Sequence, residues 1–143
     1  MIPAHPPEPL VAEQLALQPL YQRTSRLLGQ LAGILLLRAA GADPDRGHAH
    51  LPALGAQYAA ACDAYRRLET PRHLAASFRA IGEALRQIGA ALGEFDARSP
   101  RSTLPARLQA ARRALQQGSR PALGLLPIDL DSACCAGHGH FPA

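Results

Sequence analysis

The hydrophobic positions between residues 71 and 95 recur at alternating steps of four and three residues. The large apolar side chains of this repeat are Leu74, Phe78, Ile81, Leu85, Ile88, Leu92 and Phe95. An unbroken repeat of this kind is typical of a helix that packs at a shallow angle against other helices. Thr70 is a suitable N-cap and Pro71 a suitable first helical residue, so the pattern predicts a helix over residues 71–95.

Small residues flank this repeat on both sides. One flank carries Ala75, Gly82 and Gly89, and the other carries Ser77, Ala84 and Ala91. Small side chains let a neighbouring helix approach closely, so two flanks of this kind favour neighbours on two sides. The helix therefore belongs in a bundle.

Two further helices follow from the same periodicity. A helix is predicted to start at Pro52 and to extend to residue 68, with a stripe at steps of three and four made of Leu51, Leu54, Tyr58, Ala61, Tyr65 and Leu68. Residues 104–117 are predicted to bury Leu104, Leu108, Ala111 and Leu115 and to stop at Gly118. The break at residues 69–71 lies between two consecutive heptad helices, which predicts an antiparallel hairpin.

The first third of the chain is predicted to contain a short helix and a long one. Residues 9–17 form a short amphipathic helix that breaks near Pro19, because proline lacks the N–H that an inner helical turn requires. A longer helix begins at Leu20 and ends at Gly41. Its apolar stripe is wide and contains Thr24, Leu27, Leu28, Leu31, Ile34 and Leu35. A stripe of that width is buried from more than one direction.

These elements predict an all-α fold, an up-and-down antiparallel four-helix bundle with a short N-terminal helix and an irregular C-terminal cap over residues 121–130. The length of 143 residues suits one core. We expect a single domain over residues 1–143, with an extended arm at 1–8 and a tail at 131–143.

Composition narrows the function classes. All fifteen basic residues are arginine, so a P-loop and a lysine Schiff base are excluded. The abundance of Ala, Arg, Gly, Pro and Leu is best explained by a GC-rich genome. We find no targeting signal, and the longest apolar run, residues 27–37, is about half the length that a bilayer requires. We therefore expect a cytoplasmic protein with no membrane association.

The arginines after residue 97 are a candidate binding surface. No acidic residue occurs from 97 to 128, a stretch that contains Arg98, Arg101, Arg107, Arg112, Arg113 and Arg120. On a helix these side chains spread round the polar face, and no aromatic residues interleave to stack bases. A solvated face is the favoured interpretation, nucleic acid is not expected as a partner, and an acidic protein partner stays open.

Catalytic patterns are missing from the sequence. The glutamates at 13, 83 and 94 have no histidine three residues on, so a di-iron bundle is excluded. No glycine-rich phosphate loop, nucleophile elbow or zinc-protease helix is present. Cys62 is interpreted as a small core residue and not as a nucleophile paired with His73. These observations leave the question of an enzyme open and favour a non-enzyme.

The C-terminal tail carries the strongest chemical signal. Cys134, Cys135, His138 and His140 place two thiols and two imidazoles within seven residues, a ligand set that zinc or cuprous ions prefer. Adjacent cysteines do not easily reach one tetrahedral ion. The alternative is a terminus that holds these residues by chance. His48 and His50 are a weaker echo, interpreted as a surface loop.

Two functions follow from these residues. One is a small helical-bundle binding protein that holds or delivers a transition metal through its Cys/His tail. The other is a non-catalytic interaction or assembly module, with no metal, that docks a protein partner or a second copy of itself through apolar helix faces. A homodimer is expected in either case because helices of unequal length leave apolar surface uncovered.

Overall fold

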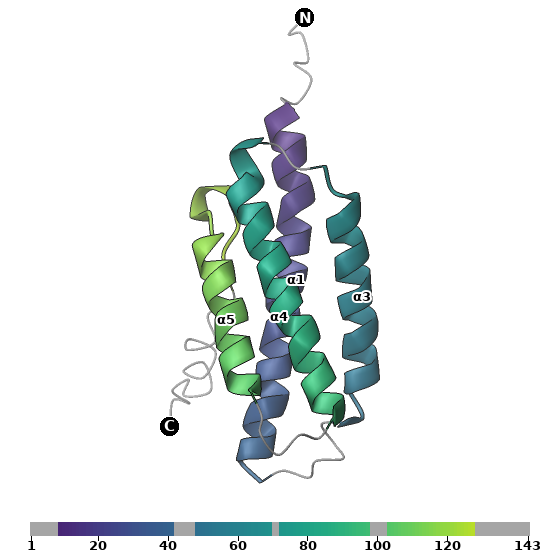
Figure 1. Ribbon diagram of the computed structural model, residues 1–143. Helices are drawn as coiled ribbons and strands as arrows, with labels where there is room; N and C mark the ends of the chain where they lie inside the picture. Colours follow the sequence, from purple (N-terminus) through teal and green to yellow (C-terminus); the bar gives the residue numbers. More distant parts are fainter. Residues whose placement is uncertain (1–8, 42–47, 70–71, 98–102, 128–143) are drawn as a thin grey trace, which may run out of the picture.

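The computed structural model describes residues 9–41, 48–69, 72–97 and 103–127. Their long helices are α1 (Pro9–Ala39), α3 (Leu51–Arg67), α4 (Ala75–Ala97) and α5 (Leu104–Gln117). Two short 3₁₀ turns, η1 (Arg72–Leu74) and η2 (Pro121–Leu123), precede α4 and follow α5. The helices run alternately up and down (Figure 1). The predicted all-α four-helix bundle is confirmed.

The repeat of residues 71–95 forms the centre of the core. Its large side chains are buried at Leu74, Ile81, Leu85, Ile88 and Phe95, and partly buried at Phe78 and Leu92. The first turn is the 3₁₀ turn η1, and the α-helix proper begins at Ala75. Helix α4 contacts each of the other three long helices, and so does α1.

The predicted break at Pro19 is wrong. Helix α1 continues through Pro19 as one element of 31 residues. An internal proline costs about 3 kcal/mol or more because it removes a backbone hydrogen bond. Leu17 and Leu20, on either side of the proline, are both buried in the core, while Pro19 itself is exposed. A break would pull one of these leucines out of the core, so packing overrides the local preference.

Tyr21 fixes the same part of α1 to α5. Its buried hydroxyl donates a hydrogen bond of 2.5 Å to the carbonyl oxygen of Leu115, 94 residues further along the chain. Burial raises the pKa of Tyr21 to about 12, because the tyrosinate form would lose its hydration. The phenol therefore stays protonated and continues to donate.

The two small flanks of α4 receive different neighbours. On one flank the rings of Tyr65 and Tyr58 from α3 lie over Gly82 and Gly89, so that a Cβ on either glycine would lie 2.8 Å or 2.7 Å from the tyrosine Cζ. On the other flank α5 approaches directly, and a Cβ on Gly118 would lie 2.5 Å from the Cβ of Ala80. The expected close approach on two sides is present.

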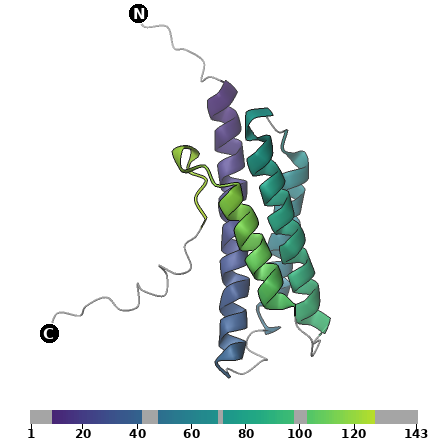
Figure 2. The same ribbon diagram turned by 60° about the vertical axis from the view of Figure 1, so that its left-hand side comes forward.

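The boundaries of α5 agree with the prediction, from Leu104 to Gln117 with Gly118 as C-cap. After it, the chain folds back beside the bundle (Figure 2), and an antiparallel bridge joins Arg120 to Leu125. Leu125 is buried in the core, and Gly124 lies against Gln18 of α1. The turn at Gly124 is therefore packed against α1, whereas Leu126 after it is exposed.

Candidate functional site

The predicted metal ligands Cys134, Cys135, His138 and His140 lie outside the described residues. Within residues 9–41, 48–69, 72–97 and 103–127, the structure brings together no group of three or more His, Cys, Asp or Glu side chains that would hold a metal ion. The tail stays a prediction from the sequence.

Three further histidines, His48, His50 and His73, are divided between the two ends of the bundle. His48 and His50 precede α3, where Nδ1 of His48 lies 3.4 Å from a terminal guanidinium nitrogen of Arg38. His73 is exposed in η1 at the other end. The predicted surface position of His50 agrees with its exposure.

Cys62 is half-buried on α3 with a free thiol. Its interaction partner is the hydroxyl of Tyr58, one turn earlier. Burial, together with this hydrogen bond, raises the pKa of Tyr58 to about 12. The thiol thus contacts a protonated phenol, but Cys62 is only half-buried and is not among the buried core residues, so the interpretation as a core residue holds only in part.

The arginines of α5 do not form one surface. Nε of Arg107 lies 2.6 Å from Oε1 of Glu94 on α4, and the side chain of Thr103 also donates to this oxygen. The Thr103 hydroxyl and then Arg107 hold the pKa of Glu94 below its usual value. Arg113 is exposed, whereas Arg98 and Arg101 lie outside the described residues. The predicted solvated face therefore holds for Arg113, while Arg107 joins α5 to α4.

The C-terminal end of α1 carries the most exposed apolar side chains of the described chain. Leu36 is 64% exposed and Leu37 is 57% exposed, and the third large exposed residue is Leu126 at 56%. The neighbouring Arg38 lies over the ring of Phe95, with its guanidinium carbon 4.7 Å from the ring centroid. This contact holds the end of α1 against α4 and leaves the two leucines on the outside.

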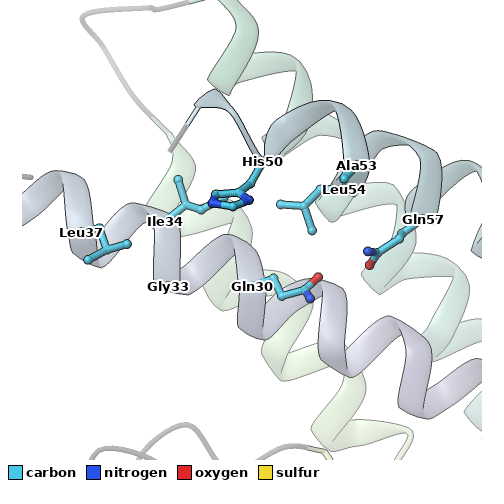
Figure 3. A pocket seen from close by; sticks show the side chains of 8 residues that line it. All are labelled: Gln30, Gly33, Ile34, Leu37, His50, Ala53, Leu54 and Gln57. Carbon is cyan, nitrogen blue, oxygen red and sulfur yellow. The ribbon is translucent and has the colours of Figure 1, made fainter. Parts of the chain in front are cut away.

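Two grooves flank this end of α1. The first, named the α1–α3 groove, has a volume of about 330 Å³ and is lined by Gln30, Gly33, Ile34, Leu37, His50, Ala53, Leu54 and Gln57 (Figure 3). The second, named the α1–α5 groove, has a volume of about 280 Å³ and is lined by Leu28, Ala32, Leu35, Leu36, Pro105, Leu108, Gln109 and Arg112. Both grooves are mainly apolar, so they suit binding by contact with apolar groups.

The sequence carried part of the signal for these grooves. The stripe on residues 20–41 is wider than one neighbour can cover, and Leu28 and Leu35 at its edge line the α1–α5 groove. No atom lies within 4 Å of where a Cβ on Gly33 would be, so this glycine deepens the α1–α3 groove. Sequence reasoning missed the pairing of Gly33 with Ala53, because the register of two helices is not visible in one stripe.

Comparison of the chain with protein-family models, with curated proteins and with solved structures finds no match. In the part of the chain that the structure describes, no helix has both the length and the apolar character needed to cross a membrane.

Proposed function

We propose that this protein is a non-catalytic assembly module that pairs with a second copy of itself through the α1–α5 groove. The observation that carries the proposal is the position of Leu36, which projects from the rim of an apolar groove with 64% of its surface in contact with water. An exposed apolar ridge beside an apolar hollow is a combination typical of interaction surfaces.

A ridge next to a hollow is self-complementary. In a twofold dimer both copies use the same patch. A residue that projects from this patch on one copy therefore enters the same patch on the other copy. Leu36 of each copy would enter the space between Ala32 and Leu108 of the other copy. Burying one leucine completely contributes about 1.5–3 kcal/mol, and the twofold axis would double this contribution.

The test is the mass of the purified protein in solution. We expect light scattering at tens of micromolar to give a dimer, and we expect Leu36→Asp to give a monomer because the charge would be buried in the interface. Leu126→Asp is the matched control, since Leu126 is an exposed leucine outside this groove. Circular dichroism of both variants checks that helix content is unchanged.

A monomeric parent protein would overturn the proposal. So would equal dissociation by Leu36→Asp and Leu126→Asp, because the interface would then lie elsewhere.

The second candidate function is metal binding by the C-terminal tail. Its support is the sequence from 134 to 140, in which two thiols and two imidazoles occur within seven residues. Ligation requires thiolates and neutral imidazoles, so we expect binding of zinc or cuprous ion to release protons and to weaken as the pH falls through the histidine range.

Elemental analysis of untagged protein after exposure to each ion tests this candidate. We expect stoichiometric metal in the parent and loss of most of it in the Cys134→Ser, Cys135→Ser double variant. Helix content should not change, because the heptad core contains neither cysteine. No stoichiometric metal in the parent would leave the assembly function alone.

A further inference from the structure

The α1–α3 groove continues beyond the apolar hollow of Figure 3. A second hollow of about 500 Å³ is lined by Arg23, Arg26, Gln30, Gln57 and Ala60. Gln30 and Gln57 line both hollows, so the two form one continuous groove between α1 and α3. From Arg23 to Leu37 the groove follows about 21 Å of α1, which is about four helical turns.

The spacing of the residues that line the groove resembles that of a bundle surface on which a further helix packs. Among the residues of α1 that line it, Arg23, Arg26, Gln30, Gly33 and Leu37 recur at alternating steps of three and four, and Ile34 lies next to Gly33. The residues that line the opposite side, on α3 and just before it, are His50, Ala53, Leu54, Gln57 and Ala60. Residues on both α1 and α3 are thus spaced seven apart, and Gly33 and two alanines permit close approach. A groove of this kind can receive a further helix in a bundle.

The chemistry of the groove changes along its length. At one end lie Leu37 and Ile34, in the middle Gln30 faces Gln57 across the groove, and at the other end lie two arginines (Figure 3 shows the first two parts). Arg23 and Arg26 have no ion-pair or hydrogen-bond partner among the described residues. The cationic end therefore favours a ligand with negative charge at that end only.

We propose that the α1–α3 groove binds an amphipathic helix of another protein, with acidic residues at one end and apolar residues two turns away. Arg26 and Gly33 are seven residues apart, which corresponds to about 10.5 Å along the helix. The acidic residues occupy the N-terminal turn of the partner helix, where negative charge is also stabilised by the helix dipole. The partner helix then runs parallel to α1.

The other occupants fit the groove less well. A second copy would bring its own arginines, and the chain already carries a net charge of +4. A fatty acid would satisfy the arginines, but its methylene chain would cover Gln30 and Gln57 and leave two amide groups without hydrogen-bond partners. A helix can place a polar side chain between these amides, so it satisfies all three parts of the groove.

The probe is a fluorescein-labelled helical peptide of about five turns. On an alanine background, it carries Glu, Glu, Gln, Leu and Leu on one face, in this order and at the same alternating steps as the α1 stripe. The control peptide carries Arg in place of both Glu residues. We expect saturable binding of the acidic peptide by fluorescence anisotropy, with binding weakened by added salt, and no saturable binding of the control peptide.

Variants of the groove locate the binding. We expect the Arg23→Glu, Arg26→Glu double variant to weaken binding about tenfold or more, because like charges would then face each other. Arg79→Glu, Arg113→Glu is the charge-matched control, since both arginines are exposed outside the groove. Gly33→Leu should also weaken binding by filling the groove, and it leaves the core intact because no atom lies within 4 Å of the added Cβ.

Leu36→Asp separates this proposal from the proposed self-association. We expect this variant to bind the peptide as the parent does, because Leu36 lines the other groove. Absence of peptide binding, or binding that the groove variants do not change, would overturn the helix partner. Displacement of the probe by a long-chain fatty acid that binds more tightly than the peptide would also overturn it, in favour of an anionic amphiphile.

Discussion

The α4–α5 pair and the α1–α3 pair show two ways of packing antiparallel helices in one bundle. Helices α4 and α5 share the most extensive contact among the described elements, and Gly118 lies directly against Ala80. Helices α1 and α3 touch less, and a groove runs between them. Small residues occur at both interfaces, so size alone does not decide whether an interface closes.

The difference lies in what faces each small residue. At the α4–α5 interface, a Cβ on Gly118 would meet the side chain of Ala80 and the backbone of Ser77, so no room is left there for a further side chain. On α3 the large side chains Tyr58 and Tyr65 are directed at α4, where Tyr65 stacks on Phe78 with centroids 4.2 Å apart. The side of α3 next to α1 carries Leu54 together with small or polar residues such as Ala53 and Gln57. Closed packing stabilises the α4–α5 pair, whereas the α1–α3 pair leaves a groove.

The largest change in stability is expected when a leucine is shortened, and it should differ between the α4 repeat and the α1–α3 groove. Leu85→Ala removes a side chain from the centre of the α4 repeat and should cost about 2–5 kcal/mol of unfolding free energy, because a closed cavity remains. Leu54→Ala should cost less, toward the lower end of this range, because Leu54 borders a groove that water already reaches. Urea denaturation measures both. Arg86→Ala, on the exposed face, is the control for Leu85→Ala, and equal stability of that pair would contradict the bundle register.

The second prediction uses two glycines. Gly118→Ala should destabilise by about 1–3 kcal/mol, since its Cβ would force α5 away from Ala80. Gly93→Ala should stabilise by about 0.5–1 kcal/mol, because Gly93 is an exposed helical position with no atom within 4 Å of a Cβ. Thermal unfolding of the two variants gives opposite shifts in Tm if the α4–α5 interface is as closed as described. A stabilising Gly118→Ala would show that it is not.

The third prediction concerns alkaline pH. The pKa of Tyr21 rises from 10.0 to about 12 on folding because of burial, so its contribution to stability is complete below pH 10 and is lost as the pH rises toward 12. The chain has no lysine to titrate in this range. Tyr21→Phe should lose about 0.5–1.5 kcal/mol at pH 7 with the hydrogen bond to Leu115, and its stability should fall less steeply between pH 10 and 12. An unchanged slope would exclude Tyr21 as a source of the alkaline loss.

The smallest change in stability is expected at Glu94, at the end of the α4–α5 pair that lies away from Gly118. The pKa of Glu94 is lowered by the Thr103 hydroxyl and by Arg107, so its stabilising contribution is present above its unfolded pKa near 4.5 and is lost as the pH falls through the lower folded value. We expect Glu94→Gln to lower Tm slightly at pH 7 and to flatten the acid dependence. Tm measured at pH 7 and at pH 3 shows the difference. Arg107→Ala, which removes the ion-pair partner, should reproduce part of the flattening.

Most of the fold could be predicted from the sequence because heptad spacing is a local property. The stripe of residues 104–117 predicted α5 with its bounds, and the stripe of residues 52–68 predicted α3 within one residue of its start. Gly41 was expected to follow α1, and its φ of +78° is the left-handed conformation that ends helices. The predicted break at Pro19 is wrong because the helix-breaking rule for proline considers only local structure. The residues on either side of Pro19 are held in the core by distant contacts.

The candidate sites divide in the same way. The Cys/His tail was visible in the sequence because its four residues lie within seven positions, and it stays a prediction because it lies outside the described residues. The two grooves were not visible, since each is formed by residues of two helices. Leu36 and Leu37 read as part of one apolar run, yet they border different grooves on two sides of α1.

The sequence by itself determined which residues of each helix are apolar, where most helices begin and end, and therefore that the chain forms an antiparallel bundle. Only the tertiary structure decided which small residues are in contact and which border open space. Gly118, the C-cap of α5, lies against Ala80, whereas Gly33, inside α1, borders a groove. The physical reason is that helical periodicity fixes the direction of a side chain, whereas the distance to the next helix depends on the largest side chains that separate the pair.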